Sequence, residues 1–240
     1  MTREEIFNNL EKIEIREGKE RTIKSYVLRN NVLSDEQKEI VANNANKYCV
    51  FFKDEFIKPE TLFSDQNKSV IVEIGFGMGA STQIIAKERS EYNYLCLEVY
   101  LQGFVKLLRD VANLNLDNIR LMRFNAVDVL SHMIPDNSIE GFHIFFPDPW
   151  PKKKHHKRRL IQSDFVSLLS RKLKKGGYIY LATDWEEYAE WMKEVLSNEE
   201  SLENPYNGYA TPISWRPETK FERKGLEKDY KINELWFVKK

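Results

Sequence analysis

The sequence predicts a doubly wound α/β domain, in which helices cover both faces of a mostly parallel sheet. From residue 69 onward, short β-branched or aromatic runs alternate with stretches of helical spacing, which is the order of βαβ units. The first run, SVIVEI, is followed by a glycine-rich turn and then by a helical stretch, as in the opening unit of such sheets. The chain has 240 residues, of which 42% are hydrophobic, and this suits one packed domain.

Each expected element follows from its pattern. Ser34 is the expected cap of a helix that runs to Lys47, and Asp184 the expected cap of a later helix. Further helices are expected over residues 80–89, 101–113 and 160–173. The expected strands cover residues 69–74, 94–99, 119–124, 139–146, 178–183, 208–212 and 235–239. Without a repeat or a low-complexity linker, we expect one domain over residues 35–240, preceded by a basic tail or arm over residues 1–34.

Composition narrows the classes of function. Lysine plus arginine and aspartate plus glutamate number 37 each, so nucleic acid would have to be bound by a local basic face rather than by bulk charge. Cys49 and Cys96 are too few and too far apart for a metal cluster, and no metal is expected. The N-terminus has no signal-peptide pattern, and no apolar run approaches the length of a membrane span. We therefore expect a cytoplasmic protein without a membrane anchor.

The glycine-rich turn and the next two strand ends indicate a nucleoside ligand. Gly75 and Gly77 would let the backbone turn sharply and approach the ligand, but the same spacing occurs in dinucleotide-binding dehydrogenases. Carboxylates favour a ligand with a cationic amino-acid end, and an amide oxygen beside a backbone N–H suits an adenine edge. S-adenosyl-L-methionine has both groups, and we expect it to be bound by Glu73, Gly75, Gly77, Glu98, Asn125 and Ala126.

A proline-rich loop follows the fourth expected strand. Its sequence, FPDPWP over residues 146–151, contains three prolines that stiffen an extended chain around Asp148 and Trp150. Six of the next eight residues are lysine or arginine, which is the electrostatic pattern of a polyanionic substrate beside a reaction centre. We expect phosphate contacts from this run and from the basic entry segment, through Arg21, Lys24, Arg29, Lys152, Lys153, Lys154, Lys157, Arg158 and Arg159.

Together these motifs resemble the bacterial tRNA (guanine-N7)-methyltransferases, which modify the guanine at position 46 of the variable loop. The resemblance extends from about residue 21 onward, and its most specific parts are Phe145–Pro151 with the basic run and the TKFE segment over residues 219–222. It implies the class I methyltransferase sheet, with seven strands of which the last is antiparallel. It also implies cofactor contacts by Glu73, Glu98, Asn125 and Asp148, although many bacterial members carry Asp where this chain has Asn125.

The resemblance further implies that Asp148 belongs to the active site, and that Lys152, Asp184, Thr219, Lys220, Phe221 and Glu222 contact the substrate. Guanine N7 carries a lone pair and no proton, so direct in-line methyl transfer needs positioning more than a general base. We expect tRNA as the partner, no obligate protein partner, and a monomer or homodimer. The alternatives are a methyltransferase of an exocyclic amine, a tRNA-binding module without catalysis, and a nicotinamide oxidoreductase.

Overall fold

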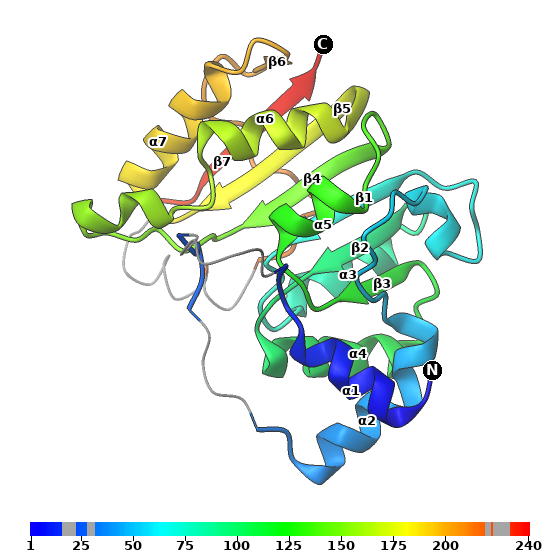
Figure 1. Cartoon of the computed structure of the whole chain (residues 1–240). Coiled ribbons are helices and arrows are strands. Elements are labelled where there is room, and N and C mark those ends of the chain that lie inside the picture. Colours follow the sequence, from blue (N-terminus) through cyan, green and yellow to red (C-terminus); the bar gives the residue numbers. More distant parts are fainter. Residues whose placement is uncertain (16–22, 28–31, 219–221, 223–230) are drawn as a thin grey trace.

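A seven-stranded sheet forms the centre of the computed structural model, which describes residues 1–15, 23–27, 32–218, 222 and 231–240. In that part of the chain the strand order is β3-β2-β1-β4-β5-β7-β6, with β1 to β5 paired in parallel and β7 antiparallel to both β5 and β6 (Figure 1). The strands are β1 (Val70–Ile74), β2 (Asn93–Leu97), β3 (Ile119–Met122), β4 (Ile139–Phe145), β5 (Leu173–Thr183), β6 (Leu202–Glu203) and β7 (Asn233–Lys239).

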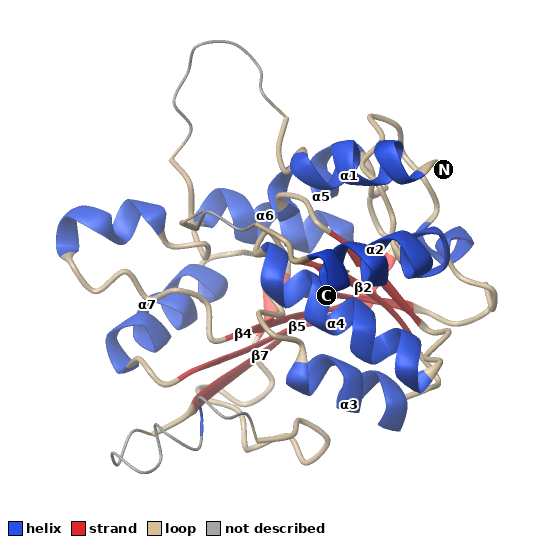
Figure 2. Cartoon of the chain, turned by 90° about the horizontal axis from the view of Figure 1, so that it is seen from below, coloured by secondary structure: helices blue, strands red, loops and turns tan. Residues whose placement is uncertain are grey.

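Helices cover both faces of the sheet (Figure 2). Side chains of α5, α6 and α7 pack on one face with Val70, Val72 and Ile74 of β1, while those of α2, α3 and α4 pack on the other face with Ile71. This division follows the two-residue period of a strand, and every residue of β1 is buried because the strand lies in the middle of the sheet. The helices are α1 (Arg3–Glu11), α2 (Asp35–Tyr48), α3 (Ala80–Glu88), α4 (Leu101–Leu114), α5 (Ala126–His132), α6 (Ser163–Lys172) and α7 (Glu186–Ser197), with 3-10 helices η1 (Pro59–Leu62) and η2 (Lys153–Arg158).

The predicted fold class is confirmed, and most of the expected elements are present. Ser34 caps α2 through a hydrogen bond from the Gln37 backbone N–H, as expected. The strand expected over residues 208–212 is wrong: those residues form a loop, and the edge strand is β6 instead. Asp184 does not cap α7, because the N-cap residue is Trp185, which makes no side-chain cap hydrogen bond. The short helix α5 was not predicted.

The N-terminal segment differs from the expected arm at its beginning. Thr2 caps α1 in a capping box with Glu5. Ile6 and Leu10 of α1 are 1% and 4% exposed and join the same core as α2 and α4. Residues 3–11 are therefore part of the packed domain, because two apolar residues four positions apart lie on one face of a helix. Within the described ranges, no helix is both long and apolar enough to cross a membrane.

Candidate active site

A cavity of about 270 Å³ opens at the carboxyl ends of β1 to β4. Ligands of open α/β sheets bind at this edge, where the strand order reverses on either side of β1. Its walls combine apolar side chains with a few polar groups, the usual composition of a nucleoside site. Six residues predicted from the sequence line it: Gly75, Gly77, Glu98, Asn125, Ala126 and Asp148.

The shape of the glycine loop requires glycine at two positions, because a residue with a side chain would be strained there. Gly75 and Gly77 have φ angles of 78° and 55°, in the left-handed region, and a Cβ at either would point into open space. Gly103 of α4 was not among the residues predicted for the site. A Cβ there would lie 1.9 Å from the Gly77 carbonyl oxygen, so the helix approaches the loop only because residue 103 is glycine. A glycine inside a helical pattern is the signal that could have found it.

Glu98, at the end of β2, ties the glycine loop to the neighbouring strand end. One carboxylate oxygen accepts a 2.7 Å hydrogen bond from the Gly77 N–H, and the other accepts from Val99 and Tyr100 at 2.7 and 2.9 Å. Burial raises the pKa of this carboxyl, these backbone donors oppose the rise, and Asp148 adds to it. Each carboxylate oxygen has two acceptor sites, so the oxygen bonded to Gly77 retains capacity for a ligand hydroxyl.

Glu73 lies deeper than the cavity lining. Its side chain is 3% exposed, points to the same side of β1 as α3, and accepts a 3.0 Å hydrogen bond from the Thr82 hydroxyl. Burial raises the pKa of Glu73 to about 8, although the Thr82 hydrogen bond opposes the rise. Burial therefore favours the neutral form of this carboxyl in the structure. A cationic group brought close to it would favour the charged form.

Asn125 has a structural role in addition to the one predicted. It is the N-cap of α5, where its side-chain oxygen accepts a 2.8 Å hydrogen bond from the Val127 N–H. Aspartate and asparagine are equally good N-caps, which gives a physical reason why either residue suits this position. The amide oxygen has a second acceptor site, and Ala126, at the first position of α5, also lines the cavity.

The proline-rich loop after β4 has an unusual backbone. Phe146 and Trp150 have φ angles of 51° and 45°, where residues with a Cβ are strained. The Phe146 N–H donates to the Ala182 carbonyl at 2.7 Å, so the loop leaves the sheet from a fixed point beside β5. Strain of this kind costs about 1–3 kcal/mol and is concentrated at functional sites. Asp148 is exposed and lines the cavity from this loop.

Two residues of the N-terminal segment complete the cavity wall, although neither was predicted to lie there. Ser25 and Tyr26 line the cavity. Tyr26 lies 122 positions before Asp148 in the sequence. The Trp150 indole donates to the Ser25 carbonyl at 3.1 Å, and Arg158 donates to the Tyr26 carbonyl at the same distance. The Tyr26 hydroxyl donates to Glu14 at 2.8 Å. The interleaved tyrosine in a basic segment was the available signal, but it does not specify this location.

Trp150 packs beneath the loop. The Arg158 guanidinium lies 4.0 Å from the centre of its indole ring, and His155 meets the ring edge-on at 5.8 Å. With one face and the N–H engaged by the protein, Trp150 acts as a support of the loop.

The basic run divides into an exposed part and a structural part. The prediction that Arg159 contacts phosphate is corrected: its side chain is buried, it donates to the Pro149 carbonyl at 2.9 Å, and it forms an ion pair with Glu187. Arg158 is also engaged, by Trp150 and Tyr26. The side chains still exposed in and before η2 are Lys152, Lys153, Lys154 and Lys157. In the entry segment, Lys24 forms an ion pair with Glu14 at 2.7 Å.

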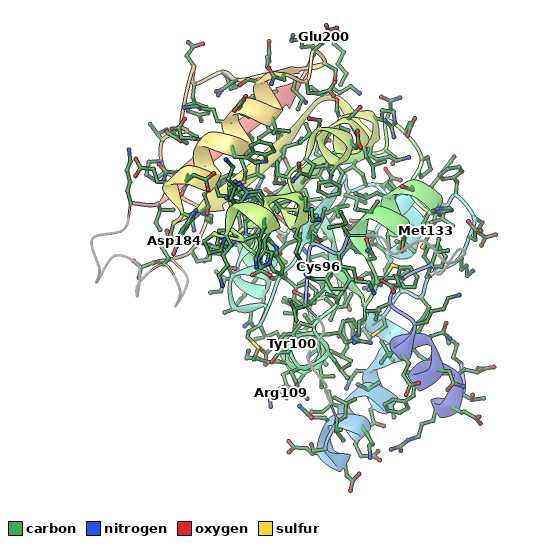
Figure 3. All side chains as sticks on the ribbon, turned by 60° about the vertical axis from the view of Figure 1, so that its left-hand side comes forward. Cys96, Tyr100, Arg109, Met133, Asp184 and Glu200 are labelled. Carbon is green, nitrogen blue, oxygen red and sulfur yellow. The ribbon has the colours of Figure 1, made fainter. Side chains whose placement is uncertain are left out.

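The residues that the resemblance assigns to the substrate differ in their burial and in their partners. Asp184 is half-buried where β5 ends, close to the start of α7 (Figure 3), and β5 is paired in parallel with β4, which leads to Asp148. The prediction that Glu222 contacts the substrate is corrected. Glu222 is 6% exposed, and both of its carboxylate oxygens accept from Arg216 at 2.7 Å. Its carboxylate thus serves a buried ion pair. The predicted residues Arg21, Arg29, Thr219, Lys220 and Phe221 lie outside the described residues.

Known methyltransferases resemble this chain in sequence. A family model described as "Putative methyltransferase" matches residues 67–235. The chain is 46% identical over 220 residues to the tRNA (guanine-N(7)-)-methyltransferase of Nitrosospira multiformis, covering 92% of this chain and 96% of the relative. It is 42% identical to the enzyme of the same name from Methylobacillus flagellatus, covering 92% of both chains. The chain belongs to the tRNA (guanine-N7)-methyltransferase family.

Membership of this family confirms the predicted class of enzyme, and the S-adenosylmethionine cofactor follows from it. Among solved structures, the 16S rRNA methyltransferase KamB is similar in fold, with a TM-score of 0.53 over 88% of this chain and 97% of KamB at 13% sequence identity. The seven strands and the antiparallel β7 are those that the resemblance implied for the class I methyltransferase sheet.

Proposed function

We propose that this protein methylates N7 of the guanine at position 46 of the tRNA variable loop, using S-adenosylmethionine. The observation that carries the proposal is the position of Asp148. It lines the cavity from a strained loop, and the exposed lysines of η2 begin a few residues later. A carboxylate at the mouth of a nucleoside-sized cavity, followed at once by a basic surface, suits a base that belongs to a polyanion.

The residues of the cavity suit S-adenosylmethionine. Gly75 and Gly77 allow close approach of a ligand to the backbone, and Glu98 offers a carboxylate for ribose hydroxyls. Asn125 and Ala126 lie beside Phe124 and Leu97, an apolar surface for an adenine ring. The cofactor, when bound, supplies an electrophilic methyl group. Glu73, beneath the loop, would become charged on approach of the cofactor's ammonium group.

The part of the protein in methyl transfer is to hold and orient the base. Guanine N7 has no proton to remove, so the site needs acceptors that fix the purine rather than a strong base. Asp148 and Asp184 follow neighbouring parallel strands. We assign them as acceptors for the guanine N1–H and exocyclic amine. Their charges would also stabilise the positive charge that develops on the purine.

We assign the contacts with the RNA backbone to the exposed basic residues. Lys152, Lys153, Lys154 and Lys157 follow the loop that carries Asp148, and they form no ion pair with another residue of the described part of the chain. The same proposal includes Arg21, Lys24 and Arg29 of the entry segment and the segment from Thr219 to Phe221. It also includes a cytoplasmic location, a single methyltransferase domain into which α1 is packed, and a monomer or homodimer without an obligate protein partner.

Transfer of a tritiated methyl group to unmodified tRNA tests the proposal. The wild-type protein should yield 7-methylguanosine, and Asp148→Ala and Asp184→Ala should each lose most of the rate, with cofactor affinity retained in Asp184→Ala. Asp54→Ala, at an exposed position, is the matched control. N6-methyladenosine as the product would support methylation of an exocyclic amine instead. Binding of tRNA without transfer by the wild type would indicate a binding module.

A further inference from the structure

Trp185 carries an exposed indole at the edge of the sheet where the proposed site lies. It follows Asp184 directly at the carboxyl end of β5 and is 39% exposed. Phe56 and Tyr206, the other aromatic side chains with large exposure in the described part of the chain, lie before η1 and after β6. Its neighbour in the chain, Asp184, is a residue that we assign to the substrate.

The start of α7, where Trp185 lies, is joined to the proline-rich loop by a chain of contacts. The backbone N–H of Trp185 donates to the Thr183 hydroxyl at 3.2 Å, and the backbone carbonyl of Trp185 accepts from the Ala189 N–H at 2.9 Å. Glu187, in the first turn of α7, forms an ion pair with Arg159, which lowers the pKa of the Glu187 carboxyl. Arg159 in turn donates to the Pro149 carbonyl at 2.9 Å. These contacts fix the start of α7, and with it the backbone of Trp185, relative to the loop that carries Asp148.

Helix capping gives an independent reason to assign Trp185 a role in binding. Trp185 is the N-cap of α7 and makes no side-chain cap hydrogen bond. Serine, threonine, aspartate or asparagine would satisfy a backbone donor at this position and stabilise the helix. A residue that violates a local stability rule at the edge of a site is typical of a position retained for function.

We propose that Trp185 is a stacking platform for a nucleobase of the RNA substrate, beside the guanine that Asp184 orients. The inference rests on the proposed tRNA substrate. Every base has a flat π-face, and aromatic side chains are the usual partners of unstacked bases in RNA recognition. Trp150 is less suited to this role, because Arg158 covers one face of its ring. The exposed lysines of η2 supply the phosphate contacts that would bring the RNA to this surface.

Binding measurements with Trp185→Phe, Trp185→Leu and Trp185→Asn test the proposal. Stacking on one base corresponds to about a tenfold change in affinity, so Trp185→Leu and Trp185→Asn should bind unmodified tRNA about tenfold more weakly. Trp185→Phe should retain most of the affinity. Cofactor affinity should be unchanged in all three, and Trp185→Asn should unfold at the same temperature as the wild type or higher, since asparagine is a better N-cap.

Fluorescence separates stacking from an indirect structural effect. Unmodified tRNA should quench the tryptophan emission of the wild type, and this quenching should be much smaller in Trp185→Phe. Trp191→Phe is the matched control, because Trp191 lies on the same helix with its indole bonded to the Ile161 carbonyl, and it should quench like the wild type. Equal tRNA affinity of wild type and Trp185→Leu, with quenching retained in Trp185→Phe, would overturn the inference. If the wild type still forms 7-methylguanosine, the proposed function survives that result.

Discussion

Arg216 forms a bidentate ion pair with Glu222, with both nitrogen–oxygen distances at 2.7 Å and side chains that are 5% and 8% exposed. The same guanidinium donates to Glu234 at 2.6 Å and to the Tyr180 hydroxyl at 2.8 Å. Its carbon lies 5.9 Å from the rings of Phe145 and Phe146. The C-terminal segment is thereby fastened to the point where the proline-rich loop leaves the sheet.

Removal of Arg216 should therefore be strongly destabilising. Arg216→Ala leaves two buried carboxylates without their counterion, and we expect a loss of about 3–5 kcal/mol in the free energy of unfolding, measured by urea denaturation. Glu39→Gln is the control, because its pair with Arg3 has the same 2.7 Å distance but side chains that are 52% and 57% exposed. That change should cost less than about 1 kcal/mol. Similar losses from the two variants would show that burial is not what gives the Arg216 pair its importance.

Glu73 should make the stability of the protein depend on pH. Its folded pKa is raised to about 8 from 4.5, so the favourable protonated state is fully present below pH 4.5 and is lost as the pH rises through 8. Glu73→Gln should thus be more stable than the wild type at about pH 8.5, by on the order of a few kcal/mol, with the difference shrinking toward about pH 5. Thermal unfolding without cofactor measures this.

The control for that experiment is Glu88→Gln, an exposed residue of the adjoining helix α3. It should show the same pH dependence as the wild type. A constant stability difference between wild type and Glu73→Gln from about pH 5 to about pH 8.5 would contradict the assignment of a raised pKa to Glu73.

The exposed lysines should determine the salt dependence of tRNA binding. Replacing Lys152, Lys153 and Lys154 by alanine should weaken binding and make the plot of log affinity against log salt shallower by about 0.7–0.9 for each phosphate that is no longer neutralised. The control is Lys38→Ala, on the exposed surface of α2 where Lys38 pairs with Asp35. An unchanged slope in the triple variant would exclude these lysines from phosphate binding.

The hydrogen bond between Trp150 and Ser25 should contribute to cofactor affinity. Trp150→Phe keeps an aromatic ring beneath the loop but removes the indole donor to the Ser25 carbonyl. Because Ser25 and Tyr26 form part of the cavity wall, we expect S-adenosylmethionine to bind roughly fivefold more weakly, the equivalent of one hydrogen bond of about 1 kcal/mol. Calorimetric titration measures the change. An affinity equal to that of the wild type would mean that the N-terminal segment covers the cavity without holding the ligand.

Most of the strands and helices, and the edge of the sheet where the site lies, could be predicted from the amino-acid sequence alone. Alternating β and α patterns, the glycines after β1 and the acidic or amide residues after β2, β3 and β4 are local features. The carboxyl ends of parallel strands necessarily meet at one edge. Six of the predicted cofactor residues therefore line one cavity.

Which charged residues are available to a substrate depends instead on how the chain packs. Arg158 and Arg159 are neighbours in one basic run, yet Arg159 is buried against Glu187 while the lysines before it remain exposed. Likewise, Ser25 and Tyr26 reach the cavity through contacts with residues more than 120 positions away. The function of a charged side chain depends on its burial and on its partner, and the partner is set by long-range packing that no local pattern specifies.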